Sequence, residues 1–382
     1  MIMNKKIVFA ITIVAVLILI MWFFVWYNFF DVTGLEFYED QPIKCFFSTN
    51  NRVFLLTEEG YGYVAGDYSN GSSRKYLNSE TTYNSYLNGS CPVKFFNGKI
   101  KQIIDEESNT FFISETDQLF RLHYDLTLES VADNVVYASA GDEVEIYFVD
   151  IYENLYVKSN EKINFLKENI KKIKCYKDFV YVLTTKGSLY LCERNDENLK
   201  FDDMLFEAVQ DFDVVDTSAR IIDGKYVSND ATAVSLPLVN VLTQGGDLYV
   251  KGAYNTLPCG QITSQAPAEP KIYEDWLHIA SDIKQFSVAP MGTIMLDEDN
   301  KALYYGFDSN LTSKAIFGKR EFDISNCEIV GAMEMCIFVK DNNGTFHIFG
   351  DKFGFPFAYT DNNDHSIMNG IAFQLMTKDE VS

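Results

Sequence analysis

The chain has 382 residues, of which 47% are hydrophobic and 15% aromatic, enough to bury a substantial core and to rule out disorder over most of its length. Acidic residues outnumber Lys and Arg by 54 to 32, which gives a formal net charge of −22. Nucleic-acid binding relies on basic side chains that displace counterions from phosphates, so a nucleic-acid partner is not expected.

The N-terminal part predicts a membrane anchor. Residues 7–30 are almost wholly apolar and follow Lys5 and Lys6. At 1.5 Å rise per residue a helix of this length crosses the hydrocarbon core of about 30 Å. The run ends in Trp22 and Trp26, residues typical of the membrane interface, where a cleaved signal peptide would end in small residues. We therefore expect an uncleaved transmembrane helix.

The flanking charges predict its orientation. Lys5 and Lys6 precede the span, and the first acidic residue after it is Asp31. The positive-inside rule then leaves residues 1–6 as a cytoplasmic stub, 7–30 as the anchor and 31–382 as an extracytoplasmic domain. The expected location is the cell membrane, with a single pass.

The chain has seven cysteines, without Cys-x-x-Cys spacing. Because the number is odd, they cannot all pair within one chain. An exported location permits disulfides, but we favour buried free thiols on strands and predict no specific bridge.

A repeat dominates the remainder. Around Gly246 an apolar run, a polar turn and a second short strand follow one another, as in a β-hairpin. The layout occurs seven times, at intervals of about 34 to 59 residues, which indicates four-stranded blades arranged radially. The turn positions are Gly60, Asp117, Glu153, Gly187, Gly246, Asn300 and Gly344. The expected fold is all-β: a seven-bladed β-propeller of four-stranded blades, preceded by one N-terminal transmembrane helix.

The repeats resemble those of the regulator of chromosome condensation superfamily of propellers. The resemblance covers about residues 35 to 382 and rests on leader segments such as Ile283 to Phe286, followed by an apolar strand, an acidic turn and a Leu-Tyr-x-x-Gly ending. The Trp-Gly pair of that family is degraded here, for example to Lys251-Gly252 and Tyr305-Gly306. The resemblance implies a binding scaffold that works through loops on one face, and it transfers no functional residue.

Catalytic motifs are sparse. There is no His-Glu-x-x-His pair, phosphate-binding loop or Gly-x-Ser-x-Gly turn, and the four histidines are far apart in the chain. The acidic stretches 297–299 and 361–364 lack the alternating spacing of a calcium loop, so solvated turns are the favoured interpretation. We expect no catalytic, cofactor-binding or metal-binding residues and no cofactor.

Long insertions between repeats are where a propeller places specificity, because blades must pack while loops vary. The candidates are 67–98, 220–238 and 254–276. The first is rich in Asn, Ser and Tyr, a composition suited to protein or glycan contact, although it also suits an ordinary outer hairpin. Its candidate binding residues are Tyr68, Tyr76, Tyr83 and Tyr86.

Two functions follow. The favoured one is a non-enzymatic, membrane-tethered scaffold that binds an envelope or extracellular protein, or a glycan, outside the cytoplasm. The alternative is an extracytoplasmic hydrolase or lyase acting on glycan or peptide, with carboxylates at the channel mouth as acid and base. Converging carboxylates with a raised pKa would favour the enzyme, and an uncharged or tyrosine-rich face would favour binding.

Overall fold

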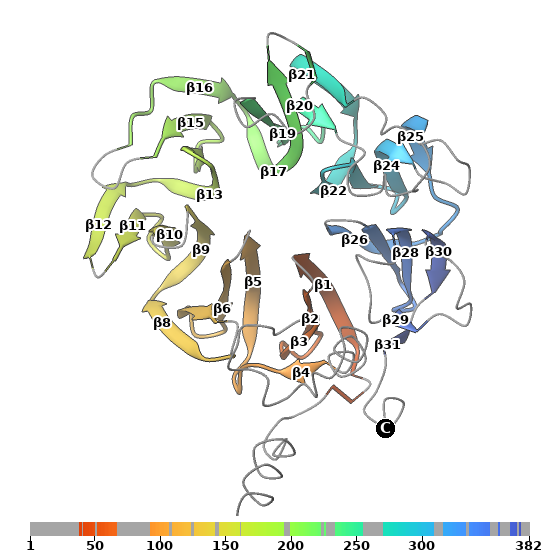
Figure 1. Ribbon diagram of the computed structural model, residues 1–382, viewed down its shortest axis with the longest axis horizontal. Coiled ribbons are helices and arrows are strands. Elements are labelled where there is room, and N and C mark those ends of the chain that lie inside the picture. The colour runs from red at the N-terminus through yellow and green to blue at the C-terminus, as the bar shows by residue number, and fades with distance from the viewer. Residues whose placement is uncertain are drawn as a thin grey trace, which may run out of the picture.

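The computed structural model describes residues 38–39, 41–49, 52–66, 92–106, 109–123, 126–141, 145–160, 162–194, 199–222, 225–226, 234–254, 270–308, 316–333, 336–351, 358–359, 367–372 and 374–375. Seven antiparallel sheets surround a common axis, and their order around the ring follows the chain (Figure 1).

The first four blades each have four strands, named from the axis outward. Blade 1 has β1 (Ile43–Thr49), β2 (Arg52–Thr57), β3 (Gly62–Gly66) and β4 (Val93–Lys94). Blade 2 has β5 (Ile100–Glu106), β6 (Asn109–Ser114), β7 (Leu119–Leu122) and β8 (Leu128–Ala132). Blade 3 has β9 (Val135–Ala140), β10 (Glu145–Asp150), β11 (Leu155–Ser159) and β12 (Lys162–Lys167). Blade 4 has β13 (Ile170–Tyr176), β14 (Phe179–Thr184), β15 (Leu189–Glu193) and β16 (Asp203–Phe206).

The last three blades complete the ring. Blade 5 has β17 (Val209–Ile222), β19 (Val234–Thr243), β20 (Leu248–Tyr254) and β21 (Lys271–Ala280), with the short β18 (Lys225–Tyr226) added beside β17. Blade 6 has β22 (Ile283–Ala289), β23 (Gly292–Asp297), β24 (Ala302–Asp308) and β25 (Ile316–Glu321). Blade 7 has β26 (Cys327–Met333), β27 (Cys336–Asp341), β28 (Phe346–Asp351) and β30 (Ile367–Ala372). A separate pair is formed by β29 (Ala358–Tyr359) and β31 (Gln374–Leu375).

The prediction of a seven-bladed propeller with four-stranded blades is confirmed, and even the two shortest repeats, blades 2 and 3, are complete. The described residues contain no helix that could span a membrane. The predicted anchor at 7–30 lies outside the described residues, so it stays a prediction.

The same turn joins the two middle strands of every blade. All seven predicted turn residues have positive φ, from 60° at Asp117 to 91° at Gly60, a region that favours Gly, Asn and Asp. Three residues earlier stands a Thr, Ser or Asp whose side-chain oxygen accepts a hydrogen bond from the backbone N–H four residues later. These capping residues are Thr57, Ser114, Asp150, Thr184, Thr243, Asp297 and Asp341.

The turns also connect neighbouring blades. At six junctions the carbonyl oxygen of the positive-φ residue accepts a hydrogen bond from the N–H that begins the next inner strand, as from Ile100 to Gly60 at 2.7 Å. The turn thus sets the position of the following blade as well as its own hairpin.

Apolar clusters fill the spaces between blades. The cluster that closes the ring joins blade 1 to blade 7, and its centre is Phe46, which is 3% exposed. The Phe46 ring centroid lies 4.7 Å from that of Phe346 and 5.7 Å from that of Phe338. Lys340 of blade 7 pairs with Glu58 in the blade 1 turn. Among the described strands none is exchanged between the first and last blades, and side chains join the two blades there.

The ring has two faces with different roles. One, the turn face, carries the seven turns and the beginnings of the inner strands, since Ile43 pairs with Thr57 and the later blades follow the same register. The opposite face, here the insertion face, carries the strand ends that flank the segments 67–91, 227–233, 255–269, 309–315 and 352–366. The long connections between the described strands are therefore attached to one face of the ring.

Candidate functional site

The insertion face is the candidate site, because the strand ends on this face flank the segments 67–91, 227–233 and 255–269, which belong to the three insertions singled out from the sequence. The first is attached to β3 and β4, where Val64 pairs with Val93. The third is attached to β20 and β21, where Tyr254 pairs with Lys271. Tyr68, Tyr76, Tyr83 and Tyr86 lie outside the described residues, so their role stays a prediction.

The second insertion is largely strand. β17 and β19 stay paired as far as Ile221 and Val234 after a register shift between Asp216 and Arg220, and Ile222 then pairs with Lys225 of β18. Blade 5 therefore extends beyond its neighbours on the insertion face, which the sequence pattern did not predict.

Charged side chains of the inner strands pair with each other along the junction of blades 4 and 5. The Nζ atoms of Lys172, Lys174 and Lys177 lie 2.8, 4.0 and 3.5 Å from carboxylate oxygens of Asp211, Asp213 and Asp216, in that order. Burial lowers the pKa of the Lys172 ammonium, but the surrounding Tyr137, Asp211 and Asp213 outweigh burial and raise it. These charges hold two blades together.

Arg194 connects blades 3 and 4 in the same way. Its guanidinium donates hydrogen bonds to the Gly141 carbonyl oxygen at 2.7 Å and to the Lys177 carbonyl oxygen at 2.6 Å, and it pairs with the Glu145 carboxylate at 2.7 Å. One guanidinium nitrogen donates to both carbonyl oxygens and the other to the carboxylate, so this is a structural contact within the ring.

One cluster resembles a catalytic triad. The Ser281 hydroxyl donates to Asp247 at 2.6 Å, and the Nε2 atom of His278 lies 3.1 Å from both side chains. In a working triad the carboxylate and the serine contact different imidazole nitrogens, so that the base is oriented while it receives the proton. Here both contact Nε2. The hydrogen bonds from Ser281 and His278 lower the pKa of Asp247, as would also hold in a triad, so the shared contact at Nε2 is the feature that sets this cluster apart.

This cluster was missed because its members are distant in the sequence. Pairing of Leu248 with Ala280 and of Tyr249 with His278, across a register shift, brings the turn residue Asp247 beside Ser281. No sequence motif marks such a contact.

The other described histidines also pair with carboxylates. His347 lies on β28, as expected of a strand residue, with Nε2 at 3.2 Å from Asp341. Burial raises the pKa of Asp341, but hydrogen bonds from His347 and from the N–H groups of Thr345 and Asn343 outweigh this, and the net direction is downward. His123 lies 3.5 Å from Glu129.

The described residues include no group of three or more His, Cys, Asp or Glu side chains that could hold a metal ion. The acidic stretch 297–299 is a repeat turn, in which the Asp297 carboxylate accepts a hydrogen bond from the Lys301 N–H at 2.8 Å. The second acidic stretch, 361–364, lies outside the described residues.

Cys45, Cys175, Cys192 and Cys327 are free thiols in the blades, as we expected. Burial raises the pKa of the Cys45 thiol to about 11 and that of Cys192 to about 12, so both are inert as nucleophiles at neutral pH. Cys91 and Cys259 lie outside the described residues.

No protein-family model matches the chain, and no curated protein matches it. Among solved structures the chain is similar to Prp20p of Saccharomyces cerevisiae, described with its binding to Gsp1p and histones: 14% identity, 76% of this chain and 80% of that chain covered, TM-score 0.49. A second structure of that protein, yeast RCC1 (Prp20) with Kap60, is similar at 11% identity and TM-score 0.43, covering 88% of this chain and 75% of that chain.

Two bacterial proteins are similar at the same level. BamB of Moraxella catarrhalis shows 10% identity and TM-score 0.44, with 89% of each chain covered. PorZ of Porphyromonas gingivalis, a surface component of a type IX secretion system, shows 13% identity and TM-score 0.46, with 82% of this chain and 37% of that chain covered. Identities this low concern the fold alone, so the function has to be argued from the chain's own residues.

Proposed function

We propose that the protein is a non-enzymatic, membrane-tethered scaffold whose insertion face binds a protein or glycan outside the cytoplasm. The observation that carries this proposal is the attachment of the long insertions to one face of a ring whose core is complete without them. Loops gathered on a rigid scaffold are the usual arrangement of a binding surface.

The described polar clusters support binding over catalysis. The lysines at the inner strand of blade 4 and Arg194, which follows β15, are engaged in pairs between blades, and the Ser281 cluster lacks the geometry of a triad. Asp247 and Asp341, the carboxyl groups with a shifted pKa, are shifted downward, away from the value that acid catalysis needs.

The tether rests on the apolar segment 7–30 and on Lys5 and Lys6 before it. An anchor of this kind would hold the ring close to partners in the cell envelope and raise its effective concentration there. The acidic ring would be repelled by an anionic lipid surface, which leaves its faces open to those partners.

A membrane-impermeant amine-reactive cross-linker, added to intact cells that produce the full chain, tests this proposal. We expect adducts with a partner for the unchanged chain, and at least a tenfold loss when Tyr68, Tyr76, Tyr83 and Tyr86 are replaced together by Ser. Aromatic side chains supply most of the contact energy in surfaces of this composition. Met204→Ser, an exposed side chain on the outer strand of blade 4, is the control and should leave the adducts unchanged.

Adducts that form only after lysis would contradict the extracytoplasmic location. Adducts that persist in the tyrosine variant would place binding elsewhere on the molecule.

A further inference from the structure

The seven repeats allow each blade to be compared with the others at the turn face. Three positions recur there. The first is the second residue of the inner strand, which lies in a register shift and has no partner in the neighbouring strand. The other two directly follow the capping residue of the turn. In blade 3 they are Val136, Ile151 and Tyr152, which are 42%, 43% and 72% exposed. In the other six blades all are polar, charged or Gly: Lys44, Glu58, Glu59, Lys101, Glu115, Thr116, Lys171, Thr185, Lys186, Gln210, Gln244, Gly245, Lys284, Glu298, Asp299, Glu328, Asn342 and Asn343.

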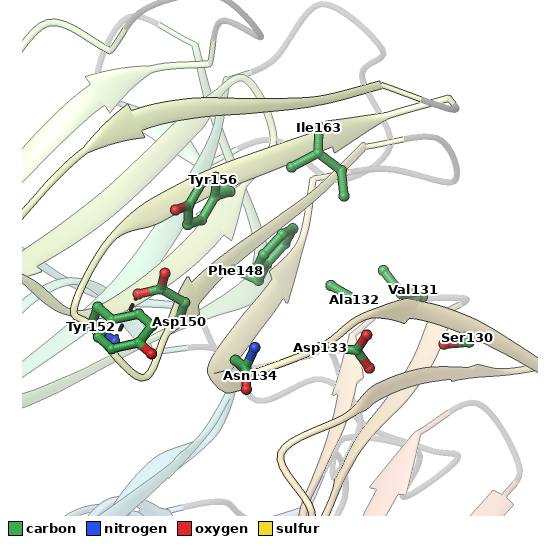
Figure 2. A pocket seen from close by; sticks show the side chains of 10 residues that line it. All are labelled: Ser130, Val131, Ala132, Asp133, Asn134, Phe148, Asp150, Tyr152, Tyr156 and Ile163. Carbon is green, nitrogen blue, oxygen red and sulfur yellow. Dashed lines mark hydrogen bonds between the residues drawn. The ribbon is translucent and has the colours of Figure 1, made fainter.

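A groove of about 450 Å³ begins beside this apolar surface, between blades 2 and 3. Figure 2 shows Ser130, Val131 and Ala132 of β8 along one side and Ile163 of β12 on the other, with Tyr152 at the turn-face end. Inside the groove the rings of Phe148 and Tyr156 stack with centroids 5.4 Å apart.

Exposed apolar side chains continue along the blade 3 wall. Ile163 and Phe165 of β12 are 48% and 56% exposed, and Phe165 meets Tyr156 edge to face. Toward the insertion face, a Lys158–Glu129 pair at 3.4 Å joins the two blades. Neighbouring exposed apolar side chains of this kind are typical of contact sites.

Two other junctions contain a ring that the groove lacks, whereas Glu168, Glu207 and Ser281 stand directly after the outer strand at three more. At the junctions of blades 1 and 2 and of blades 6 and 7, an aromatic residue directly after the outer strand fills the space. Phe95 lies 5.4 Å from Phe112, and Phe322 lies 4.3 Å from Phe349, between ring centroids. After β8 the corresponding residue is Asp133, which is exposed.

The charges favour a basic occupant. The side chains that line the groove include two carboxylates, Asp133 and Asp150, and no Lys or Arg. Asp150 is engaged by its own turn, accepting hydrogen bonds from the N–H groups of Tyr152 and Asn154, both at 2.9 Å. Asp133 accepts one hydrogen bond from Gln118 at 3.0 Å and remains exposed to a ligand.

A second copy of the chain fits poorly. Each copy carries a net charge of −22, and antiparallel pairing of two β12 strands would set Lys162 of one against Lys167 of the other. Exposed aliphatic side chains such as Ile151 and Ile163 are also unlike a glycan site, which relies on aromatic rings and polar groups.

We propose that the groove between blades 2 and 3 binds an extended peptide segment of a partner protein that carries a large apolar side chain next to Lys or Arg. The apolar side chain packs between Tyr156 and Ile163, and the cation pairs with Asp133. Tyr152 covers the segment at the turn face. This site lies on the turn face and the outer rim, away from the insertion face, and is independent of the function proposed above.

Selection from a displayed library of random dodecapeptides against the full-length chain in nanodiscs tests the proposal. We expect enrichment of an aromatic or aliphatic residue adjacent to Lys or Arg. A synthetic peptide from that pool should lose at least tenfold in affinity with Tyr152→Ala, and likewise with Asp133→Phe, which fills the groove as Phe322 fills its junction.

Lys186→Ala, at the position of Tyr152 in blade 4, is the matched control and should change affinity less than twofold. Because Tyr152 and Asp133 are exposed, neither substitution should lower the melting temperature. Enriched peptides without the basic and apolar pair, a pool with no enriched sequence, or affinities unaffected by both groove variants would overturn the proposal. None of these results bears on the tyrosines of the insertion face.

Discussion

Replacing Phe46 by Ala should lower the free energy of unfolding of the ring by about 3 to 5 kcal/mol, the usual cost of removing a buried phenyl ring. Phe46 is 3% exposed and contacts Phe338 and Phe346 across the junction of blades 1 and 7. Because these rings fill the junction between the first and last blades, a cavity at this point weakens the closure of the ring as well as the local core. Urea denaturation followed by circular dichroism measures the effect.

Phe179→Ala is the matched control. This side chain is 38% exposed on β14, so its loss should cost about 1 kcal/mol or less. Equal destabilisation by the two substitutions would mean that the junction of blades 1 and 7 is no more important than the surface, and that the ring is open there.

Gly252→Ala should also lower the free energy of unfolding strongly. The molecules that still fold should keep the same structure. Gly252 has φ +106°, and an added Cβ would lie 1.8 Å from the carbonyl oxygen of Pro237 in the paired strand. The backbone conformation alone costs roughly 1 to 3 kcal/mol for a residue with a Cβ, and the collision adds to it.

Gly318→Ala is the control for that substitution, because nothing lies within 4 Å of its added Cβ and its φ is not positive. It should leave the free energy of unfolding within about 0.5 kcal/mol of the original. If the two glycine variants had the same free energy of unfolding, the close approach of Gly252 to Pro237 would not contribute to stability.

The repeat was visible in the sequence because each turn needs a residue that tolerates positive φ. Gly60, Gly187 and Asn300 are residue types that favour positive φ, so they indicate the turn directly. Glu153 has the same conformation, with φ 65°, but only the spacing of the repeats indicates it. A second set of positive-φ residues, which precede the inner strands, escaped notice. They are Asn134, Asn169, Ala208, Asp282 and Asn326, and all but Ala208 are Asn or Asp, the residue types that tolerate this conformation.

The groove and the Ser281 cluster could not be predicted, for a physical reason. Both depend on contacts between segments that only the assembled sheet brings together, as when β20 and β21 pair with a register shift beside Asp247. The groove further depends on what is missing between two blades, namely an aromatic ring at the position of Asp133. Tyr152 directly precedes the predicted turn residue Glu153, so its repeat position was visible in the sequence, but its exposure beside a groove was not.

One variant tests whether the rigid ring and the binding face are separate: an Asn-Gly turn replaces residues 67–90, which keeps the register of β3 and β4. Val64 and Val93 are already paired, and Pro92, whose carbonyl oxygen accepts a hydrogen bond from the Tyr38 N–H at 2.9 Å, is retained. A two-residue turn of this type closes a hairpin without strain. Urea unfolding should then show an unchanged or slightly higher stability, because a shorter loop costs less entropy to close, while the cross-linked partner is lost. A fall of several kcal/mol in stability, or a partner still captured by the folded variant, would contradict the separation of scaffold and binding face.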